Sequence, residues 1–266
     1  MECFGRYYFL DGNILPIEHG EEIAAGEVSF YEVIRTRKGV PLFFDDHMKR
    51  LNDGISTRYD LKDDIAEIIT EGLDALVRQE TFAEINVRIT VSFTGQEHSV
   101  RICYITSSYP DDETVSHGVP LIFYRAERFD PGVKLLNNRL RLSVNEALVK
   151  KKAYEALLVN KGGFITEGSR SNVFFVNAKS ILFTAPDSMV LPGITRKYVI
   201  DICRREGYDL IFEAVKASEL SDFQSAFITG TSPMVLPVKS IDNHFFRTDN
   251  DILKQLSILY RQLAGD

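Results

Sequence analysis

Residues 155–176 read EALLVNKGGFITEGSRSNVFFV and decide the fold of the second half of the chain. The stretch consists of apolar runs rich in β-branched and aromatic residues, which Lys161-Gly162-Gly163 and Gly168-Ser169 interrupt. Short runs of this composition between Gly and Ser clusters are typical of strands joined by tight turns. A further apolar run, SILFTA, follows. We therefore expect a strand-rich domain around this stretch.

The N-terminal part predicts a second, smaller unit. RYYFLDGNILPIE and YEVIRTRKGVPLFF carry the turn signals Asp11-Gly12 and Lys38-Gly39, so each predicts a hairpin. DDHMKRLNDGISTR and a segment capped by Asp63 predict two helices, and INVRITVSF and VRICYITSS predict strands. The polar stretch YPDDETVSHG, which precedes the strand-like VPLIFYRA, is the candidate linker. We therefore expect one domain over residues 1–112 and another over 118–266.

Three helices are expected in the second domain. An amphipathic pattern covers residues 139–152. LPGITRKYVIDICRREG predicts a helix with Thr195 as its cap and Gly207 as its stop. The last helix is expected from Thr248 to Leu263.

Composition excludes some classes of partner. The 266 residues include 31 basic and 38 acidic side chains, which leave a formal charge of -7 without a basic stripe, so no nucleic-acid partner is expected. No basic leader and no apolar run of about 18 residues is present, so we expect neither secretion nor a membrane span. Cys3, Cys103 and Cys203 are odd in number and widely spaced, which favours reduced structural thiols in the cytoplasm and no metal site.

Lys134 in GVKLLNNRL lies in an unusually apolar setting. A desolvated lysine amine is a nucleophile that forms Schiff bases. The alternative is a surface lysine whose stem packs while its ammonium reaches water.

Two further candidates lie in the second domain. Glu167 ends an apolar run, where a carboxylate could hold a protonated heterocyclic nitrogen, although it could also be an ordinary turn acid. LPGITR would bring the amides of Ile194 and Thr195 and the Thr195 hydroxyl to a helix N-terminus, which favours a phosphate but also suits a structural cap.

The remaining candidates also suit anions. His47 and Arg50 share a helical face, where Arg50 could bind a phosphate in a bidentate manner. The alternative is a solvated helix face. In FITGTSPM, Gly230, Thr231 and Ser232 could offer amides and hydroxyls to a second anion, or form a plain strand exit.

Together these features closely resemble the class IV aminotransferase family, the pyridoxal 5'-phosphate enzymes of fold type IV. The likeness is carried by FYEVIRT, DDHMKRL, VKLLNN, EALLVNKGGFITEGSRSNVFFV, LPGITR and FITGTSPMVLPV. The fold it implies is α+β in two domains, a small α/β domain and a larger β-barrel-like domain, with the cofactor in the cleft between them. It also implies a homodimer and a small-molecule amino acid and 2-oxo acid as substrates.

The resemblance assigns roles to the candidates. Lys134 would be the catalytic Schiff-base lysine, and Glu167 would pair with the pyridine nitrogen. The phosphate would be bound by Arg50, Ile194, Thr195 and Thr231. The substrate side would be lined by Tyr31, Arg88, Thr231 and Ser232.

Departures from the family pattern leave the reaction open. Ser92 and Phe93 lie where D-amino acid enzymes usually carry an arginine, and Arg88 and His98 are displaced from that position. Asn137 follows the lysine where branched-chain enzymes carry a tyrosine nearby. An aminotransferase is the leading hypothesis, with 4-amino-4-deoxychorismate lyase, which releases pyruvate and 4-aminobenzoate, as the alternative. A non-catalytic member of the family is the third.

Overall fold

The computed structural model describes residues 3–17, 27–61, 64–128 and 130–265. The chain divides into two compact units. Unit 1 comprises Met1–Ser108 and Val133–Leu136; unit 2 comprises Tyr109–Gly132 and Asn137–Asp266. The sequence had assigned 118–266 to one domain, whereas the segment Val133–Leu136 groups with unit 1.

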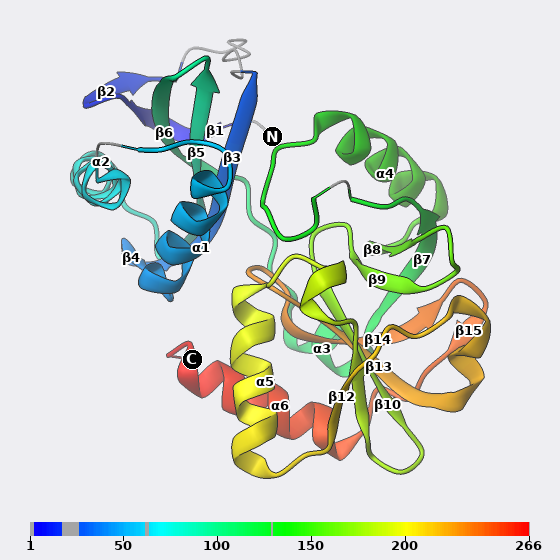
Figure 1. Cartoon of the computed structure of the whole chain (residues 1–266). Helices are drawn as coiled ribbons and strands as arrows, with labels where there is room; N and C mark the ends of the chain where they lie inside the picture. Colours follow the sequence, from blue (N-terminus) through cyan, green and yellow to red (C-terminus); the bar gives the residue numbers. More distant parts are fainter. Residues whose placement is uncertain (1–2, 18–26, 62–63, 129, 266) are drawn as a thin grey trace. The chain divides into compact units, whose positions relative to one another are not determined.

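Unit 1 is built on an antiparallel sheet with strand order β2-β1-β6-β5-β3-β4 (Figure 1). The strands are β1 (Cys3–Leu10), β2 (Asn13–Pro16), β3 (Val28–Arg37), β4 (Val40–Pro41), β5 (Glu84–Thr94) and β6 (Glu97–Ile105). Both predicted hairpins are confirmed, with positive φ at Asp11 and Gly12 and at Lys38 and Gly39. Positive φ at both central residues is the type I′ requirement that the Gly-containing turns satisfy.

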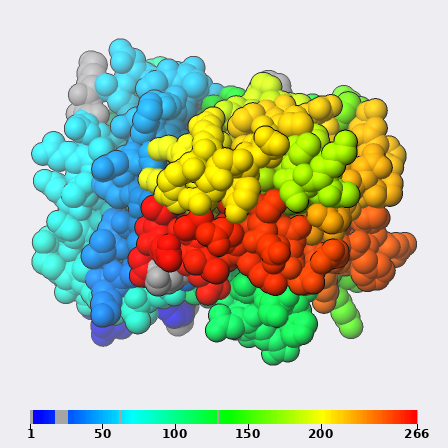
Figure 2. Space-filling view, turned by 90° about the horizontal axis from the view of Figure 1, so that it is seen from below, coloured from blue at the N-terminus to red at the C-terminus, as the bar shows by residue number. Residues whose placement is uncertain are grey.

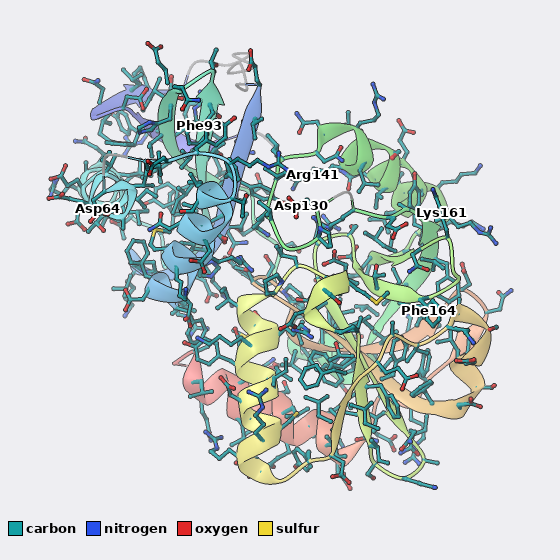
Figure 3. All side chains as sticks on the ribbon, in the orientation of Figure 1. Asp64, Phe93, Asp130, Arg141, Lys161 and Phe164 are labelled. Atoms are coloured by element: carbon teal, nitrogen blue, oxygen red, sulfur yellow. A yellow bond between two sulfur atoms is a disulfide. The ribbon has the colours of Figure 1, made fainter. Side chains whose placement is uncertain are left out.

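Helices α1 (Phe44–Ser56) and α2 (Ile65–Gln79) belong to unit 1, and the apolar residues of both helices share a core with the sheet. The N-cap of α2 is Asp64 (Figure 3), whose side chain accepts from the amides of Ala66 and Glu67. The predicted cap, Asp63, lies outside the described residues. Phe93 of β5 lies in the same core and stacks on the Tyr59 ring at 3.8 Å between centroids (Figure 3).

Successive side chains of β3 point to opposite faces of the sheet. Phe30, Glu32 and Ile34 alternate with Tyr31, so a two-residue period puts Glu32 on the helix side and Tyr31 on the other. The segment Val133–Leu136 runs beside this strand: the Tyr31 amide donates to the Lys134 carbonyl at 3.1 Å, and Phe30 forms a bridge with Leu135. These strand-like contacts are why the lysine segment belongs to unit 1.

Unit 2 contains a nine-stranded mixed sheet of order β12-β11-β10-β13-β14-β7-β8-β9, with β15 on β14 (Figure 1). Its strands are β7 (Val119–Arg125), β8 (Glu155–Val159), β9 (Ile165–Gly168), β10 (Asn172–Asn177), β11 (Leu182–Thr184), β12 (Leu210–Phe212), β13 (Phe223–Gly230), β14 (Met234–Ile241) and β15 (His244–Phe245). The strands predicted from residues 155–176 are confirmed as β8, β9 and β10.

The sheet of unit 2 is curled. The Ile165 amide at the start of β9 donates to the carbonyl of Val215, which follows β12, at 2.8 Å, and Phe164 bridges to Lys216. Because β9 and β12 are the two ends of the strand order, these contacts bring the ends together. The β-barrel-like expectation for this unit is therefore confirmed.

The helices of unit 2 are α3 (Asp112–His117), α4 (Asn138–Lys151), α5 (Ile194–Glu206) and α6 (Asp251–Leu263), with the 3-10 helices η1 (Asp187–Met189) and η2 (Ala217–Asp222). The predicted stop of α5 at Gly207 is confirmed by its left-handed φ of 74°, but its N-cap is Gly193 rather than Thr195. The predicted linker contains α3, which Asp111 caps through the Thr114 amide. Across the described ranges, no helix is both long and apolar enough to cross a membrane.

The cysteines correct a prediction. Cys3 of β1 and Cys103 of β6 form a disulfide with a Cα–Cα distance of 5.6 Å, whereas all three thiols were expected to be reduced. The two strands pair, with Cys3 opposite Ile105, so Cys103 is a diagonal neighbour across 100 residues of sequence. Only Cys203 stays free, and burial raises the pKa of its thiol to about 12. The cysteine argument for a cytoplasmic location therefore no longer holds, since disulfides are typical of oxidising compartments.

Reduction of the disulfide is expected to destabilise unit 1. A cross-link closing a loop of 100 residues contributes about 2–4 kcal/mol to the free energy of unfolding. Cys103→Ser should lower the midpoint of denaturant unfolding, and a reductant should then have no further effect; in Cys203→Ser the reductant effect should persist. Thiol titration of the denatured, unreduced wild type should find one free thiol. Three free thiols would contradict the pairing.

Candidate active site

Glu32, His47 and Arg50 form a buried charged cluster in unit 1. Arg50 Nε donates to Glu32 Oε1 at 2.7 Å and Arg50 Nη2 to Glu32 Oε2 at 2.6 Å. His47 Nδ1 lies 2.7 Å from Glu32 Oε2. Glu32 and His47 are buried, so the face of α1 that carries His47 and Arg50 is not a solvated face. The predicted pair His47 and Arg50 does share one face, and the carboxylate that it meets comes from β3.

The protonation states of the cluster follow from its charges. Burial raises the pKa of Glu32, but the charge of Arg50 and the hydrogen bonds from His47 and Arg50 outweigh burial and lower this pKa to about 2. Burial lowers the pKa of His47, against the opposing effect of Glu32. An ionised carboxylate only accepts hydrogen bonds, so the neutral imidazole donates from Nδ1. Glu32 therefore fixes both the orientation of Arg50 and the tautomer of His47.

Lys134 lies close to Tyr31 and is not a fully solvated lysine. Its Nζ is 4.8 Å from the centre of the Tyr31 ring, and its charge contributes to the lowered pKa of His47. The register of β3 and β5 pairs Tyr31 with Thr90 and Val33 with Arg88, so Arg88 lies diagonally next to Tyr31 on the same sheet face. Unit 1 thus brings the predicted amine, Tyr31 and Arg88 together.

Glu167 is buried at the end of β9 in unit 2 and forms an ion pair. Arg128 Nε lies 2.8 Å from Glu167 Oε1, and the Leu191 amide donates to Glu167 Oε2 at 3.2 Å. Arg128 also donates to the carbonyl of Ser169 at 2.9 Å. A turn acid without a specific role would be solvated, whereas Glu167 is buried and paired with Arg128 inside the unit.

Glu155 holds the turn that follows Glu167. Its buried carboxylate accepts from the amides of Ala156 and Arg170 at 2.8 and 3.1 Å, and from the hydroxyls of Ser169 and Ser171 at 2.6 and 3.1 Å. Four donors of this kind satisfy a buried carboxylate without a cation. The orientation of Glu167 depends on this turn.

The loop before α5 is tied to the same turn. Asn172 Nδ2 donates to the Leu191 carbonyl at 2.9 Å, while the Leu191 amide binds Glu167. A Cβ at Gly193 would collide with Asn172 Oδ1, so the close approach requires glycine there. The start of α5 is therefore held by the residues around Glu167.

The N-terminus of α5 has no side-chain cap, and its first residues, Ile194 and Thr195, are buried. Unpaired amides and the helix dipole at such an end suit an anion. The Thr195 hydroxyl lies 3.1 Å from the Tyr260 hydroxyl of α6. The predicted cap at Thr195 is therefore wrong, because Thr195 is the second residue of the helix. Its hydroxyl and amide nevertheless lie at the N-terminal end of α5, as predicted.

Thr231 and Ser232 lie in the tight turn between β13 and β14, half-buried, in the same unit as Glu167 and Thr195. Met234 follows with a φ of 54°, and Gly230 pairs with Met234 across the hairpin. In the described part of the chain, no cluster of three or more His, Cys, Asp or Glu could hold a metal ion.

Four residues that contact the candidates were not singled out from the sequence: Glu32, Arg128, Glu155 and Tyr260. Glu32 and Glu155 carried a signal, because each is an acidic residue whose immediate neighbours in the sequence are apolar or aromatic. Arg128 lies in the loop after β7 and Tyr260 on the apolar side of the last helix, where no local pattern marks them.

Residues 29–241 match the family profile described as amino-transferase class IV. Among curated relatives, D-alanine aminotransferase from Bacillus licheniformis is 28% identical over 80% of this chain and 78% of its own length. A putative branched-chain-amino-acid aminotransferase from Methanocaldococcus jannaschii is 26% identical over 95% of this chain and 92% of its own.

Solved structures share the fold. The branched-chain aminotransferase of Thermoproteus uzoniensis, solved with norvaline, aligns with a TM-score of 0.81 and 23% identity over 97% of this chain and 95% of its own. The Escherichia coli branched-chain aminotransferase aligns with a TM-score of 0.82 and 20% identity over 99% and 95%. The fold is therefore the α+β fold type IV that the resemblance implied. With four-fifths of its length inside the family profile, the chain belongs to the class IV aminotransferases and is an enzyme.

Proposed function

We propose that the protein is a pyridoxal 5'-phosphate-dependent aminotransferase that transfers an amino group between an amino acid and a 2-oxo acid. Class IV aminotransferases use this cofactor. The observation that carries the proposal is the buried Glu167 carboxylate, which pairs with Arg128 and accepts a hydrogen bond from the Leu191 amide. Leu191 lies three residues before the uncapped start of α5, so Glu167 and this helix start are linked. A ring-nitrogen partner and a phosphate anchor are both parts of a pyridoxal phosphate site.

The residues present fit the cofactor chemically. Glu167 would hold the pyridine nitrogen, and the amides of Ile194 and Thr195 would bind the phosphate with Thr231 and Arg50. Arg50 is oriented by Glu32, so its planar guanidinium is fixed before any ligand arrives.

Lys134 would supply the amine that attaches the cofactor covalently and the base that moves the proton at the substrate α-carbon. Pyridoxal phosphate, when bound, supplies an electron sink for the electrons of the bond that breaks. The Tyr31 ring, whose centre lies 4.8 Å from the Lys134 Nζ, would help to position this amine.

Tyr31, Arg88, Thr231 and Ser232 would contact the substrate. Arg88 and Tyr31 share a sheet face in unit 1, which supports a carboxylate contact beside the amine. The relatives above are named as D-alanine and branched-chain aminotransferases, which supports amino transfer over release of pyruvate from aminodeoxychorismate. An assay for keto-acid formation that requires 2-oxoglutarate tests this choice; acceptor-independent pyruvate release would favour the lyase.

Lys134→Ala tests the attachment of the cofactor. Wild-type protein with added pyridoxal phosphate should absorb near about 410 nm, and borohydride should fix the cofactor covalently. The variant should lose covalent fixation and nearly all amino transfer, because the amine proposed to attach the cofactor is removed. Lys161→Ala, on the exposed turn between β8 and β9 (Figure 3), should behave as wild type. Fixation that survives in Lys134→Ala would contradict the assignment.

Glu167→Gln should keep cofactor binding but lower kcat by about 100-fold or more, which corresponds to roughly 3 kcal/mol of transition-state stabilisation. A neutral amide can still accept a hydrogen bond from the Leu191 amide, but it has no negative charge to favour a protonated ring nitrogen. Steady-state kinetics and absorbance spectra measure the two effects. Glu127→Gln is the matched control, since Glu127 is exposed one residue before Arg128. Equal kcat in both variants would exclude this role.

Ionised Glu32 should make unit 1 acid-sensitive. Its pKa falls from an ordinary 4.5 to about 2, so its contribution is complete above pH 4.5 and is lost as pH falls from 4.5 toward 2. The size is roughly 3 kcal/mol at neutral pH. Free energies of unfolding between pH 7 and pH 3 should therefore converge for wild type and Glu32→Gln as pH falls. Exposed Glu71→Gln should stay parallel to wild type, and a pH-independent gap for Glu32→Gln would refute the prediction.

A further inference from the structure

We infer that Tyr260 is a positioning residue of the phosphate subsite: its hydroxyl, 3.1 Å from Thr195 Oγ1, would donate to that oxygen and leave the Thr195 proton for the anion. The inference rests on the proposed function for the identity of that anion. Tyr260 lies on the last helix, outside every motif that carries the family resemblance. It comes to Thr195 across 65 residues of sequence.

The two hydroxyls meet inside unit 2. Tyr260 is 4% exposed and Thr195 5%, and their oxygens are 3.1 Å apart. Leu253, Leu256 and Tyr260 share the buried face of α6, and this face holds the ring in place. Figure 2 shows the yellow surface of α5 directly beside the red surface of α6, in agreement with the hydroxyl contact.

The direction of this hydrogen bond follows from counting protons. A threonine hydroxyl has one proton to donate and two lone pairs that accept. A phosphate only accepts from the protein, so Thr195 must donate to the phosphate if it is to bind it. Tyr260 must then be the donor in the hydroxyl pair. In a buried site, a donor to Thr195 also polarises its O–H bond and strengthens the bond that Thr195 makes in turn.

The start of α5 differs from the starts of the other α-helices of the unit. Side chains cap α3, α4 and α6 through Asp111, Asn137 and Asn250, but Gly193 offers α5 no side chain. An uncapped, buried helix start with an oriented hydroxyl is a donor set that fits an anion. A purely structural tie between α5 and α6 is the competing explanation, and it predicts a different response to mutation.

The test is equilibrium binding of pyridoxal 5'-phosphate, and of pyridoxal without its phosphate, to the cofactor-free protein and its variants. Tyr260→Phe should weaken pyridoxal phosphate binding by about fivefold, the effect of one neutral hydrogen bond, and leave pyridoxal binding unchanged. Thr195→Val should weaken pyridoxal phosphate binding at least as much, and the double variant no more than Thr195→Val alone. Tyr208→Phe, a half-buried tyrosine of the same unit, should match wild type.

Thr195→Ser keeps the hydroxyl and should keep the dependence on Tyr260, which covers the case in which valine disturbs the helix. The inference is overturned if Tyr260→Phe weakens both ligands equally, or if its effect persists in Thr195→Val. If the wild type binds no pyridoxal phosphate, the proposed function fails. The role of Tyr260 is then tested with inorganic phosphate as the ligand. A phosphate-dependent rise in Tm for wild type that Tyr260→Phe loses supports the hydroxyl pair; equal rises, or none, overturn it.

Discussion

The carboxylate of Glu155 is the constraint on which the rest of unit 2 depends. It is buried without a cation, so it must find its hydrogen bonds among the neighbouring amides and hydroxyls, and it takes them from the turn after β9. That turn orients Glu167, which holds the Leu191 amide, and Leu191 leads into α5. One buried charge therefore sets the position of a second carboxylate and of a helix start.

Unit 1 also buries a carboxylate, that of Glu32, but pairs it with a cation, the Arg50 guanidinium. Glu32 is buried, yet its pKa is near 2, because the Arg50 guanidinium and the His47 ring approach it from α1. Removing Arg50 would leave the Glu32 carboxylate buried without its cation, which is costly in an interior. The same two hydrogen bonds between Arg50 and Glu32 thus stabilise the unit and orient the Arg50 guanidinium. A substitution that breaks them should affect both.

Much of the secondary structure could be predicted from local sequence. Hairpins with glycine at positive φ, the strands of residues 155–176 and the C-terminal stop at Gly207 are local events, and the structure confirms them. The predicted caps at Asp63 and Thr195 missed by one or two residues, because several neighbouring residues can cap a helix. The Cys3–Cys103 disulfide and the partners of Glu167 depend on strand pairing and loops far apart in sequence. No periodicity carries such information.

The segment Val133–Leu136 belongs to unit 1, while the residues on both sides of it belong to unit 2. The chain therefore changes unit at three points, after Ser108, after Gly132 and after Leu136. No single cut yields both units complete. A fragment that begins at Tyr109 would contain Lys134 without the β3 strand beside which it runs, and a fragment that ends at Ser108 would lack the lysine. Recombination between relatives could exchange the units only by replacing this short segment together with the N-terminal part, so Lys134 would have to be exchanged along with residues that lie far from it in the sequence.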